Sequence, residues 1–425
     1  MVALQRIWQC FAGIVTAVIV IHTLTPDAQG WYYSLLNAAA VFTLFDMGLS
    51  LILVQRSASL RAGLSLTTEG APVGSNALKF SGLAAFSYRW YRISAAWFFA
   101  LLLPIGLYIF SIPNSDSEPQ MWQLLWLCLT LAVSVNLWLL PSLSLVEGGG
   151  DMASVYGLRL VQGVFGALVC WIVLLSGGGA WASLAVPLIS AGLGLFWLFR
   201  RKPSLILLRN AQSQVDSDDA LWPQQWRLAL TWVGGFALAQ IYVPVLLVFN
   251  KPVEAGQLGL TLAIANMLAI ISQSWLTSAY PRMSLSAAQR SWYSLRTIFR
   301  RALLISAGFY LVAAVVVSLI LMHPLLSLYA NRLLPMPILL ALLVGIFINQ
   351  FCASLAAYIR ASGRESFVWI SLATTFLTLL GAVAVVADYG VNGLVLVILA
   401  VQVLFALPLS IRIWYKQRKR IESES

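Results

Sequence analysis

The sequence contains few charged residues. Asp, Glu, Lys and Arg make up only 10% of its 425 residues, whereas they account for about a quarter of a typical soluble domain. Acidic residues are scarcer than basic ones, 15 against 26, and 60% of the chain is hydrophobic. A water-soluble protein of this size could not cover its surface with so few polar groups. The composition therefore excludes an ordinary soluble enzyme, a disordered protein and a fibrous protein, and it indicates a large integral membrane protein.

Residues that commonly bind metals or form disulfides are also scarce. Four cysteines, Cys10, Cys128, Cys170 and Cys352, each lie inside an apolar run, and no Cys-x-x-Cys or Cys/His spacing is present. Cysteines in apolar surroundings are usually inert packing residues. The sequence therefore predicts no disulfide, no metal site and no cofactor.

Twelve apolar runs are long enough to span a bilayer, which takes about 20 residues. They cover residues 4–24, 31–55, 90–112, 120–146, 153–175, 179–199, 226–249, 256–280, 301–322, 333–358, 366–387 and 391–414. No stretch alternates with the period of two that is typical of a barrel strand. The first run is longer than a signal-peptide core and lacks a convincing cleavage site, which predicts a retained helix. The sequence predicts an all-α membrane protein with about 12 transmembrane helices.

The positions of Lys and Arg predict the orientation in the membrane. If alternate loops are assigned to the inner side, starting with the N-terminus, 24 of the 26 basic residues lie on that side. Only Lys251 and Arg332 lie outside. Cytoplasmic loops carry an excess of Lys and Arg, so both termini are predicted to be cytoplasmic. The net charge of +11 is then explained by topology, and no nucleic-acid partner is expected.

Two short motifs recur in the two halves of the chain. Pro-x-x-x-Gly occurs at Pro26–Gly30 and at Pro252–Gly256, a shift of 226. A polar, Gly-containing turn occurs at Glu147–Asp151 and at Arg360–Arg364, a shift of 213. These matches predict a 6+6 pseudo-repeat, with binding between the lobes near the midplane. The predicted divisions are an N-terminal lobe (1–200), a cytoplasmic linker (201–225), a C-terminal lobe (226–415) and a cytoplasmic tail (416–425).

Two inner segments have a distinct composition. The segment Ser57–Arg89 is rich in Gly, Ser and Thr, which is typical of a flexible crossing. The segment Leu285–Arg300 places Trp292, Leu295 and Phe299 roughly opposite some of its arginines, which is typical of an interfacial helix on the inner surface.

Four stretches of the sequence carry a resemblance to a known family: Leu24–Leu35 (LTPDAQGWYYSL), Leu44–Leu49 (LFDMGL) followed by Val54–Arg56, Ala279–Ser284 (AYPRMS) and Arg360–Arg364 (RASGR). These stretches resemble the bacterial polysaccharide (O-antigen) flippases of the multidrug/oligosaccharidyl-lipid/polysaccharide exporter superfamily. The resemblance implies a two-lobed, twelve-helix transporter in the bacterial inner membrane. It implies that undecaprenyl-diphosphate-linked oligosaccharide units cross the membrane for surface polysaccharide synthesis. The expected partners are that substrate, membrane lipids, a coupling H+ or Na+ ion and other polysaccharide-assembly membrane proteins. No catalytic residues are implied.

Two ionisable residues inside predicted helices are the first candidates for function, because a charge within the membrane usually lines a cavity. Asp46 could couple transport to a proton or cation, or it could form a structural bond beside Gly48. Arg159 lies three residues before Gln162, so both can share a helix face. Its planar guanidinium could bind a diphosphate, or its side chain could extend to the inner headgroups.

Other candidates are weaker. Arg56 and Arg282 end predicted helices on the inner side at corresponding places in the two halves, where they could receive an anionic lipid or only set orientation. Neutral polar residues in the second half, among them Gln240, Asn266 and Gln350, could bind sugar hydroxyls or simply join helices.

Two other classes of function remain open from the sequence. A polymerase or ligase of the same pathway would need catalytic groups on a sizeable outer loop, but the outer loops reach only about ten residues. A multidrug/cation exporter of the same superfamily would share the fold and should carry acidic groups in the first lobe, where Asp46 is the clear intramembrane acid. A major-facilitator transporter would need an Asp in the loop 57–89, which has none.

Overall fold

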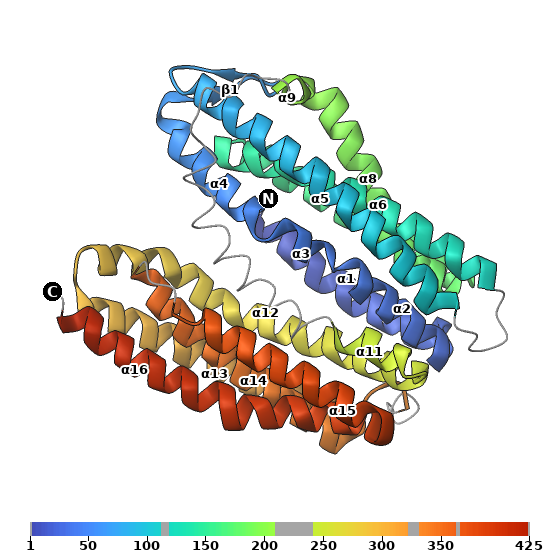
Figure 1. Ribbon diagram of the computed structural model, residues 1–425. Coiled ribbons are helices and arrows are strands. Elements are labelled where there is room, and N and C mark those ends of the chain that lie inside the picture. The colour runs from blue at the N-terminus through green and yellow to red at the C-terminus, as the bar shows by residue number, and fades with distance from the viewer. Residues whose placement is uncertain (1, 112–118, 209–240, 322–330, 363–365, 424–425) are drawn as a thin grey trace. The chain divides into compact units, whose positions relative to one another are not determined.

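The computed structural model describes residues 2–111, 119–208, 241–321, 331–362 and 366–423 (Figure 1). The chain forms two compact units, Met1–Phe236 and Ala237–Ser425. In the described residues, both units consist of helices, apart from one two-stranded hairpin. The predicted lobe boundary and the proposed linker 201–225 fall largely within residues 209–240, which lie outside the described residues.

Unit 1 contains the first nine helices and the hairpin. These are α1 (Val2–Thr23), α2 (Pro26–Ala39), α3 (Phe42–Asp46), α4 (Leu49–Leu60), β1 (Ser65–Leu66), β2 (Pro72–Val73), α5 (Ala77–Ser111), α6 (Pro119–Gly149), α7 (Met152–Leu175), α8 (Ala182–Arg201) and α9 (Pro203–Leu207). Helix α7 packs between α1 and α8, while α6 contacts α4, α5 and α8. The unit is therefore built around α6 and α7, with Glu147 near the end of α6 and Asp151 in the turn that leads to α7.

Unit 2 contains the remaining described helices. These are α11 (Tyr242–Val248), α12 (Pro252–Ala288), α13 (Trp292–Leu321), α14 (Met336–Ala361), α15 (Val368–Val401), a π-helical turn (Gln402–Ala406) and α16 (Leu407–Ser423). Helix α14 contacts α12, α13, α15 and α16 and forms the centre of this unit. Pro252 begins α12, just as Pro26 begins α2 in unit 1, so the two predicted Pro-x-x-x-Gly motifs both start helices.

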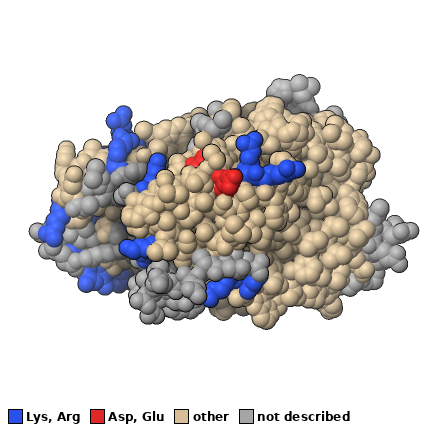
Figure 2. Space-filling model, turned by 90° about the horizontal axis from the view of Figure 1, so that it is seen from above, with Lys and Arg blue, Asp and Glu red and all other residues tan. Residues whose placement is uncertain are grey.

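The membrane-spanning character predicted from the composition is confirmed. Within the described residues, eight helices are long and apolar enough to cross a membrane, or nine if the bent α2–α4 segment is one span. The longest of these stretches, Val368–Arg420, contains two of the predicted runs. The run 226–249 lies mostly outside the described residues, and each of the other eleven overlaps a helix. Basic side chains also clearly outnumber acidic ones on the face seen in Figure 2.

The run 31–55, expected to be one helix, is broken. Met47 and Gly48 adopt left-handed φ values of 50° and 70°, and the chain bends by 47° between residues 26–46 and 49–60. Glycine adopts this conformation readily because it has no Cβ. A break inside a membrane leaves backbone groups that need partners. Asp46 satisfies one of them, because its Oδ1 accepts the Ser50 N–H at 3.2 Å.

The segment Ser57–Arg89 is not a flexible crossing, so that prediction is wrong. Helix α4 continues to Leu60, β1 and β2 pair antiparallel, and α5 already begins at Ala77. Hydrogen bonds fix the hairpin, since the Thr67 N–H donates to the Ala71 carbonyl and the Asn76 amide donates to the Leu60 carbonyl. Its many small polar residues serve tight turns and not mobility.

The stretch Leu285–Arg300 is not a separate interfacial helix. The structure divides it between the end of α12 and the start of α13, with a turn at Arg290, whose φ is 53°. The amphipathic pattern itself is present, because Leu295 and Phe299 are buried while Arg296 and Arg300 are exposed. The apolar face predicted for this stretch is therefore confirmed. The prediction of a separate interfacial helix is wrong, because α13 continues as a candidate membrane span.

A second break divides α15. Gly390 has a φ of 58°, and the N–H of the next residue, Val391, donates to Glu254 Oε2 at 2.5 Å. Glu254 belongs to the first turn of α12, so its carboxylate joins the start of α12 to the break in α15. Lys251 lies 3.9 Å from the other carboxylate oxygen.

Replacing Glu254 with Ala is expected to lower the stability of unit 2 by about 1 to 3 kcal/mol, because the Val391 N–H loses its acceptor. Lys251→Gln is the matched control. It removes only a long, partly exposed ion pair, so we expect a change of at most about 1 kcal/mol. Thermal unfolding of the purified variants measures both. Equal losses in the two variants would show that the bond to Val391 N–H contributes little.

Candidate functional site

A cavity of about 380 Å³ opens within unit 1. Its walls come mainly from α2, α6, α7 and α8, with Phe42 from α3, and most of the lining side chains are apolar, for example Leu36, Leu139 and Val186. Four polar residues interrupt this apolar lining: Asn136, Arg159, Gln162 and Ser190. A mostly apolar cavity with a few convergent polar groups is the usual form of a ligand site.

Two amides of the cavity join its helices to α8. Asn136 Nδ2 on α6 donates to the Pro187 carbonyl at 2.8 Å, and Gln162 Nε2 on α7 donates to the Ser190 carbonyl at 2.8 Å. Both acceptors belong to α8, so these bonds hold the cavity walls together. The structure places Asn136 on the same cavity as Arg159.

Among the described residues, Arg159 is the only basic one that lines the cavity. Its Nη2 lies 3.2 Å from Glu147 Oε2 at the end of α6, and its guanidinium carbon lies 5.2 Å from the centre of the Tyr156 ring. The Tyr156 hydroxyl donates to the other oxygen, Glu147 Oε1, at 2.9 Å. The Arg159 side chain is 30% exposed and that of Glu147 is 12% exposed. The cation is therefore held by a carboxylate and an aromatic ring, yet it remains accessible.

A second ion pair joins the start of α7 to the end of α8, near the Glu147–Arg159 pair. Lys202, directly after α8, lies 2.8 Å from Asp151 Oδ2, and the lysine side chain is only 5% exposed. Asp151 also caps α7, because its Oδ1 accepts the Ser154 N–H at 3.2 Å. This pair does not line the cavity. It connects α7 with α8 beside the Glu147–Arg159 pair and keeps the turn between α6 and α7 in place.

The predicted coupling residue Asp46 lies at the break of the second predicted span and not in the middle of an intact helix. It is buried and accepts hydrogen bonds from three donors, namely the Tyr91 hydroxyl, the Ser50 hydroxyl at 2.8 Å and the Ser50 N–H at 3.2 Å. Tyr91 belongs to α5, so Asp46 joins α3, α4 and α5. These contacts support its structural interpretation. A coupling role stays a prediction.

The other predicted site residues are dispersed. Arg56 is half-buried on α4 of unit 1, and Arg282 is exposed on α12 of unit 2. Asn266 is half-buried on α12, and Gln240 lies outside the described residues. Gln350 is buried on α14, where its amide donates to Ser272 Oγ at 2.6 Å and to Ser306 Oγ at 3.0 Å. Gln350 therefore joins α12, α13 and α14, which favours its helix-bonding interpretation.

The two partners of Arg159 were not predicted from the sequence. Glu147 was noticed only as part of a repeated turn, and Tyr156 was not singled out. Spacing could have identified them: Tyr156 precedes Arg159 by three residues on one helix face, and Glu147 ends the preceding helix. A short turn between two antiparallel helices brings such positions together.

Comparisons with known proteins add the fold but not the substrate. No family model matches the sequence, and no curated protein matches it significantly. Solved structures match almost the whole chain. An inward-facing multidrug resistance MATE family transporter of the MOP superfamily is 14% identical, with a TM-score of 0.66, over 99% of this chain and 95% of that one. The lipid II flippase MurJ in an inward closed conformation is 12% identical, with a TM-score of 0.67, over 99% and 89% of the two chains.

A third solved structure is described by the polarity of its binding pocket. A MOP superfamily transporter from Pyrococcus furiosus, described as having a binding pocket of reversed polarity that suggests a different function, is 14% identical, with a TM-score of 0.56, over 99% of this chain and 93% of that one. All three matches are transporters, not enzymes. The chain is thus a multi-pass integral membrane protein with the fold of the MOP superfamily transporters.

Proposed function

We propose that the protein is a flippase that moves undecaprenyl-diphosphate-linked oligosaccharide units across the bacterial inner membrane by alternating access. The observation that carries the proposal is the accessible guanidinium of Arg159, the one basic group among the described residues that line a mostly apolar cavity. A lipid diphosphate combines an anionic head with a long apolar chain. Arginine recognises phosphate with paired, charge-assisted hydrogen bonds, and the fold is shared with a lipid II flippase.

Glu147 allows the site to exchange a carboxylate for the substrate diphosphate on the Arg159 guanidinium. In the structure its carboxylate contacts Arg159 and orients the guanidinium. An incoming diphosphate carries more negative charge than one carboxylate and can replace it on the guanidinium. Tyr156 then retains Glu147 through its hydroxyl. We propose that binding and release both proceed through this exchange between Glu147 and the substrate.

A drug/cation exporter is the second candidate, because MATE transporters share the fold. Such an exporter would need an accessible carboxylate for its cation. Asp46 is buried, 6% exposed, and holds three donors. Glu147, the acid beside the cavity, already holds Arg159. Among the described residues that line the cavity, the one ionisable group is therefore the Arg159 guanidinium, which favours an anionic substrate.

Removing the competing carboxylate is expected to strengthen phosphate binding. Glu147→Gln keeps the shape of the side chain but frees Arg159, and a partly exposed ion pair is worth about 0.2 to 1 kcal/mol. We expect the variant to bind a short-chain prenyl diphosphate up to about fivefold more tightly than the wild type, as measured by calorimetry in detergent.

Tyr156→Phe is the matched control, because it leaves the Glu147–Arg159 pair in place. Its affinity should stay within twofold of the wild type. Weaker binding by Glu147→Gln would contradict the exchange.

The function itself is tested in cells that lack the gene. The deletion strain should lose surface polysaccharide and accumulate lipid-linked repeat units, identified by mass spectrometry of a lipid extract. A plasmid copy of the gene should reverse both effects. A deletion strain with normal polysaccharide and no accumulated lipid-linked sugar would contradict the proposed function.

A further inference from the structure

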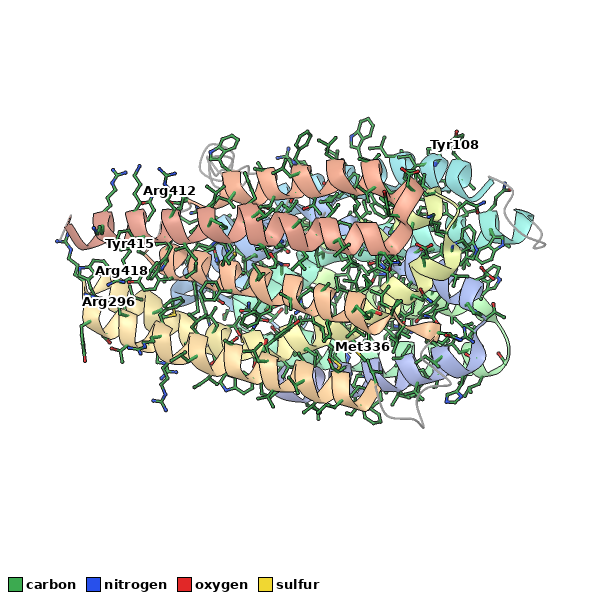
Figure 3. All side chains as sticks on the ribbon, turned by 90° about the horizontal axis from the view of Figure 1, so that it is seen from below. Tyr108, Arg296, Met336, Arg412, Tyr415 and Arg418 are labelled. Atoms are coloured by element: carbon green, nitrogen blue, oxygen red, sulfur yellow. The ribbon has the colours of Figure 1, made fainter. Side chains whose placement is uncertain are left out.

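Basic and aromatic side chains gather at one end of unit 2, on a surface separate from the cavity of unit 1. Figure 3 shows Arg296 of α13 and Arg412, Tyr415 and Arg418 of α16 at the same end, while Met336, which begins α14, lies away from it. According to the orientation predicted from the sequence, this end is cytoplasmic. We call this surface the basic end of unit 2 and define it by Arg296, Arg300, Arg301, Arg412, Lys416, Arg418 and Lys419.

An aromatic cluster brings the two helices of this surface together. Tyr358, near the end of α14, lies 4.9 Å from the ring of Phe299 on α13 and 5.8 Å from the ring of Trp414 on α16. Leu295 is buried in the same cluster, and Trp292 packs against it. The start of α13 and the end of α16 are therefore fixed against the same residue of α14.

The cations lie outside this cluster in two rows. Arg296 and Arg300 are four residues apart on α13, and Arg412 and Lys416 are four residues apart on α16, so each pair shares a helix face. All four side chains are exposed. The helices α13, α14 and α16 contain a single acidic residue, Glu422, within their described bounds. The surface is consequently positive over two neighbouring helix ends.

Aromatic rings order two of the cations. The Arg418 guanidinium lies 5.3 Å from the centre of the Trp414 ring, and the Lys419 ammonium lies 4.6 Å from the centre of the Tyr415 ring. Such cation–π contacts reduce the freedom of long basic side chains. Positive charges can set the orientation of a protein in the membrane without being held in a fixed position. Basic side chains that aromatic rings hold in place are better suited to binding a defined ligand.

The apolar surface adjoining the cations indicates what that ligand is. Leu304 on α13 is 61% exposed and Leu404 in the π-helical turn before α16 is 77% exposed, so apolar side chains continue from the basic end along both helices. A ligand that fits carries negative charge at one end and apolar chains at the other. We propose that the basic end of unit 2 binds anionic phospholipid, with the phosphate on the arginines and lysines and the acyl chains along α13 and α16.

The test compares phospholipids on the purified full-length protein and does not use transport as a readout, so it is independent of the proposed function. Native mass spectrometry should show bound phosphatidylglycerol or cardiolipin at concentrations at which phosphatidylcholine does not bind. The triple variant R412Q/K416Q/K419Q should bind phosphatidylglycerol at least tenfold more weakly. The control K79Q/R200Q/R201Q removes the same number of exposed cations from unit 1 and should bind within twofold of the wild type.

Several outcomes would overturn the proposal. One is equal binding of phosphatidylglycerol and phosphatidylcholine, and another is an equal loss of binding in the two triple variants. If R412Q/K416Q/K419Q does not fold, the wild-type protein still provides a test, because binding that depends on these charges must weaken as salt is raised. Phosphatidylglycerol binding unchanged between 0.1 and 1 M salt (roughly the range over which exposed charges become screened) would contradict the proposal. So would preferential binding of a nucleic acid or an acidic protein over the lipid.

Discussion

Replacing Arg159 with Gln is expected to slow transport of the lipid-linked oligosaccharide by at least tenfold. Arg159 is the only cation that lines the cavity in the part of the chain that the structure describes, and a hydrogen bond to a charged group is worth about 1.5 to 3 kcal/mol. This free energy corresponds to a factor of about 10 to 150 in affinity. Binding of a short-chain prenyl diphosphate to the purified variant should fall by the same factor, measured by calorimetry beside the wild type.

Lys202→Gln is the matched control for Arg159→Gln. Lys202 also holds an acid at the same ends of the helices, but it does not line the cavity. Its removal should lower the thermal stability of unit 1, because Asp151 loses a buried partner, and it should leave diphosphate affinity within twofold of the wild type. If both variants lose affinity equally, the effect of Arg159 is structural and the site lies elsewhere.

Replacing Asp46 with Ala is expected to cost unit 1 about 2 to 6 kcal/mol. The Tyr91 hydroxyl and the Ser50 N–H would both lose their acceptor in a buried place, and each unsatisfied group costs about 1 to 3 kcal/mol. The helix break at Met47 and Gly48 should also become less well defined, since Asp46 satisfies backbone exposed by the break. Thermal unfolding and the yield of folded protein in detergent measure the effect.

Asp46→Asn separates the structural role of Asp46 from coupling. Asparagine keeps one acceptor oxygen but cannot lose a proton, so the variant should retain most of its stability. If Asp46 also couples transport to an ion gradient, transport by this variant should no longer respond to that gradient. A stable Asp46→Asn variant whose transport follows the gradient as the wild type does would assign Asp46 a structural role alone.

The general architecture could be predicted from the sequence because the membrane imposes strong and simple constraints. Apolar runs of the required length identify spans, and the distribution of Lys and Arg predicts their orientation. The interruption near residue 390 could also be predicted from the sequence, because one apolar run ends at residue 387 and the next begins at residue 391. Gly390 then supplies the conformation that breaks α15.

Local features that depend on contacts between distant residues could not be predicted in this way. The run 31–55 is uniformly apolar around Asp46, so hydropathy does not reveal the left-handed pair Met47 and Gly48. The composition of 57–89 is shared by mobile loops and tight hairpins. Two hydrogen bonds distinguish the hairpin from a mobile loop, one from the Ala71 N–H to Thr67 Oγ1 and one from Asn76 Nδ2 to the Leu60 carbonyl.

The candidate site also combines a residue that could be predicted from the sequence with contacts that could not. Arg159 was recognised because an ionisable residue in an apolar run is costly. Its partners are Glu147 and Tyr156, and their positions depend on how α6, α7 and α8 pack. The cavity that these three helices form with α2 depends on the same packing. Conversely, Gln350 looked suitable for sugars, but the structure places it among the serines of two neighbouring helices.

Translocation in proteoliposomes tests the central claim most directly. The purified protein is reconstituted with a fluorescent undecaprenyl-diphosphate-linked oligosaccharide on one leaflet, and its arrival on the other leaflet is followed with an impermeant quencher. We expect rapid translocation by the wild-type protein, at least tenfold slower translocation by Arg159→Gln, and a rate near wild type for Lys202→Gln. Translocation by Arg159→Gln at the wild-type rate, or no translocation above empty vesicles by the wild-type protein, would contradict the account.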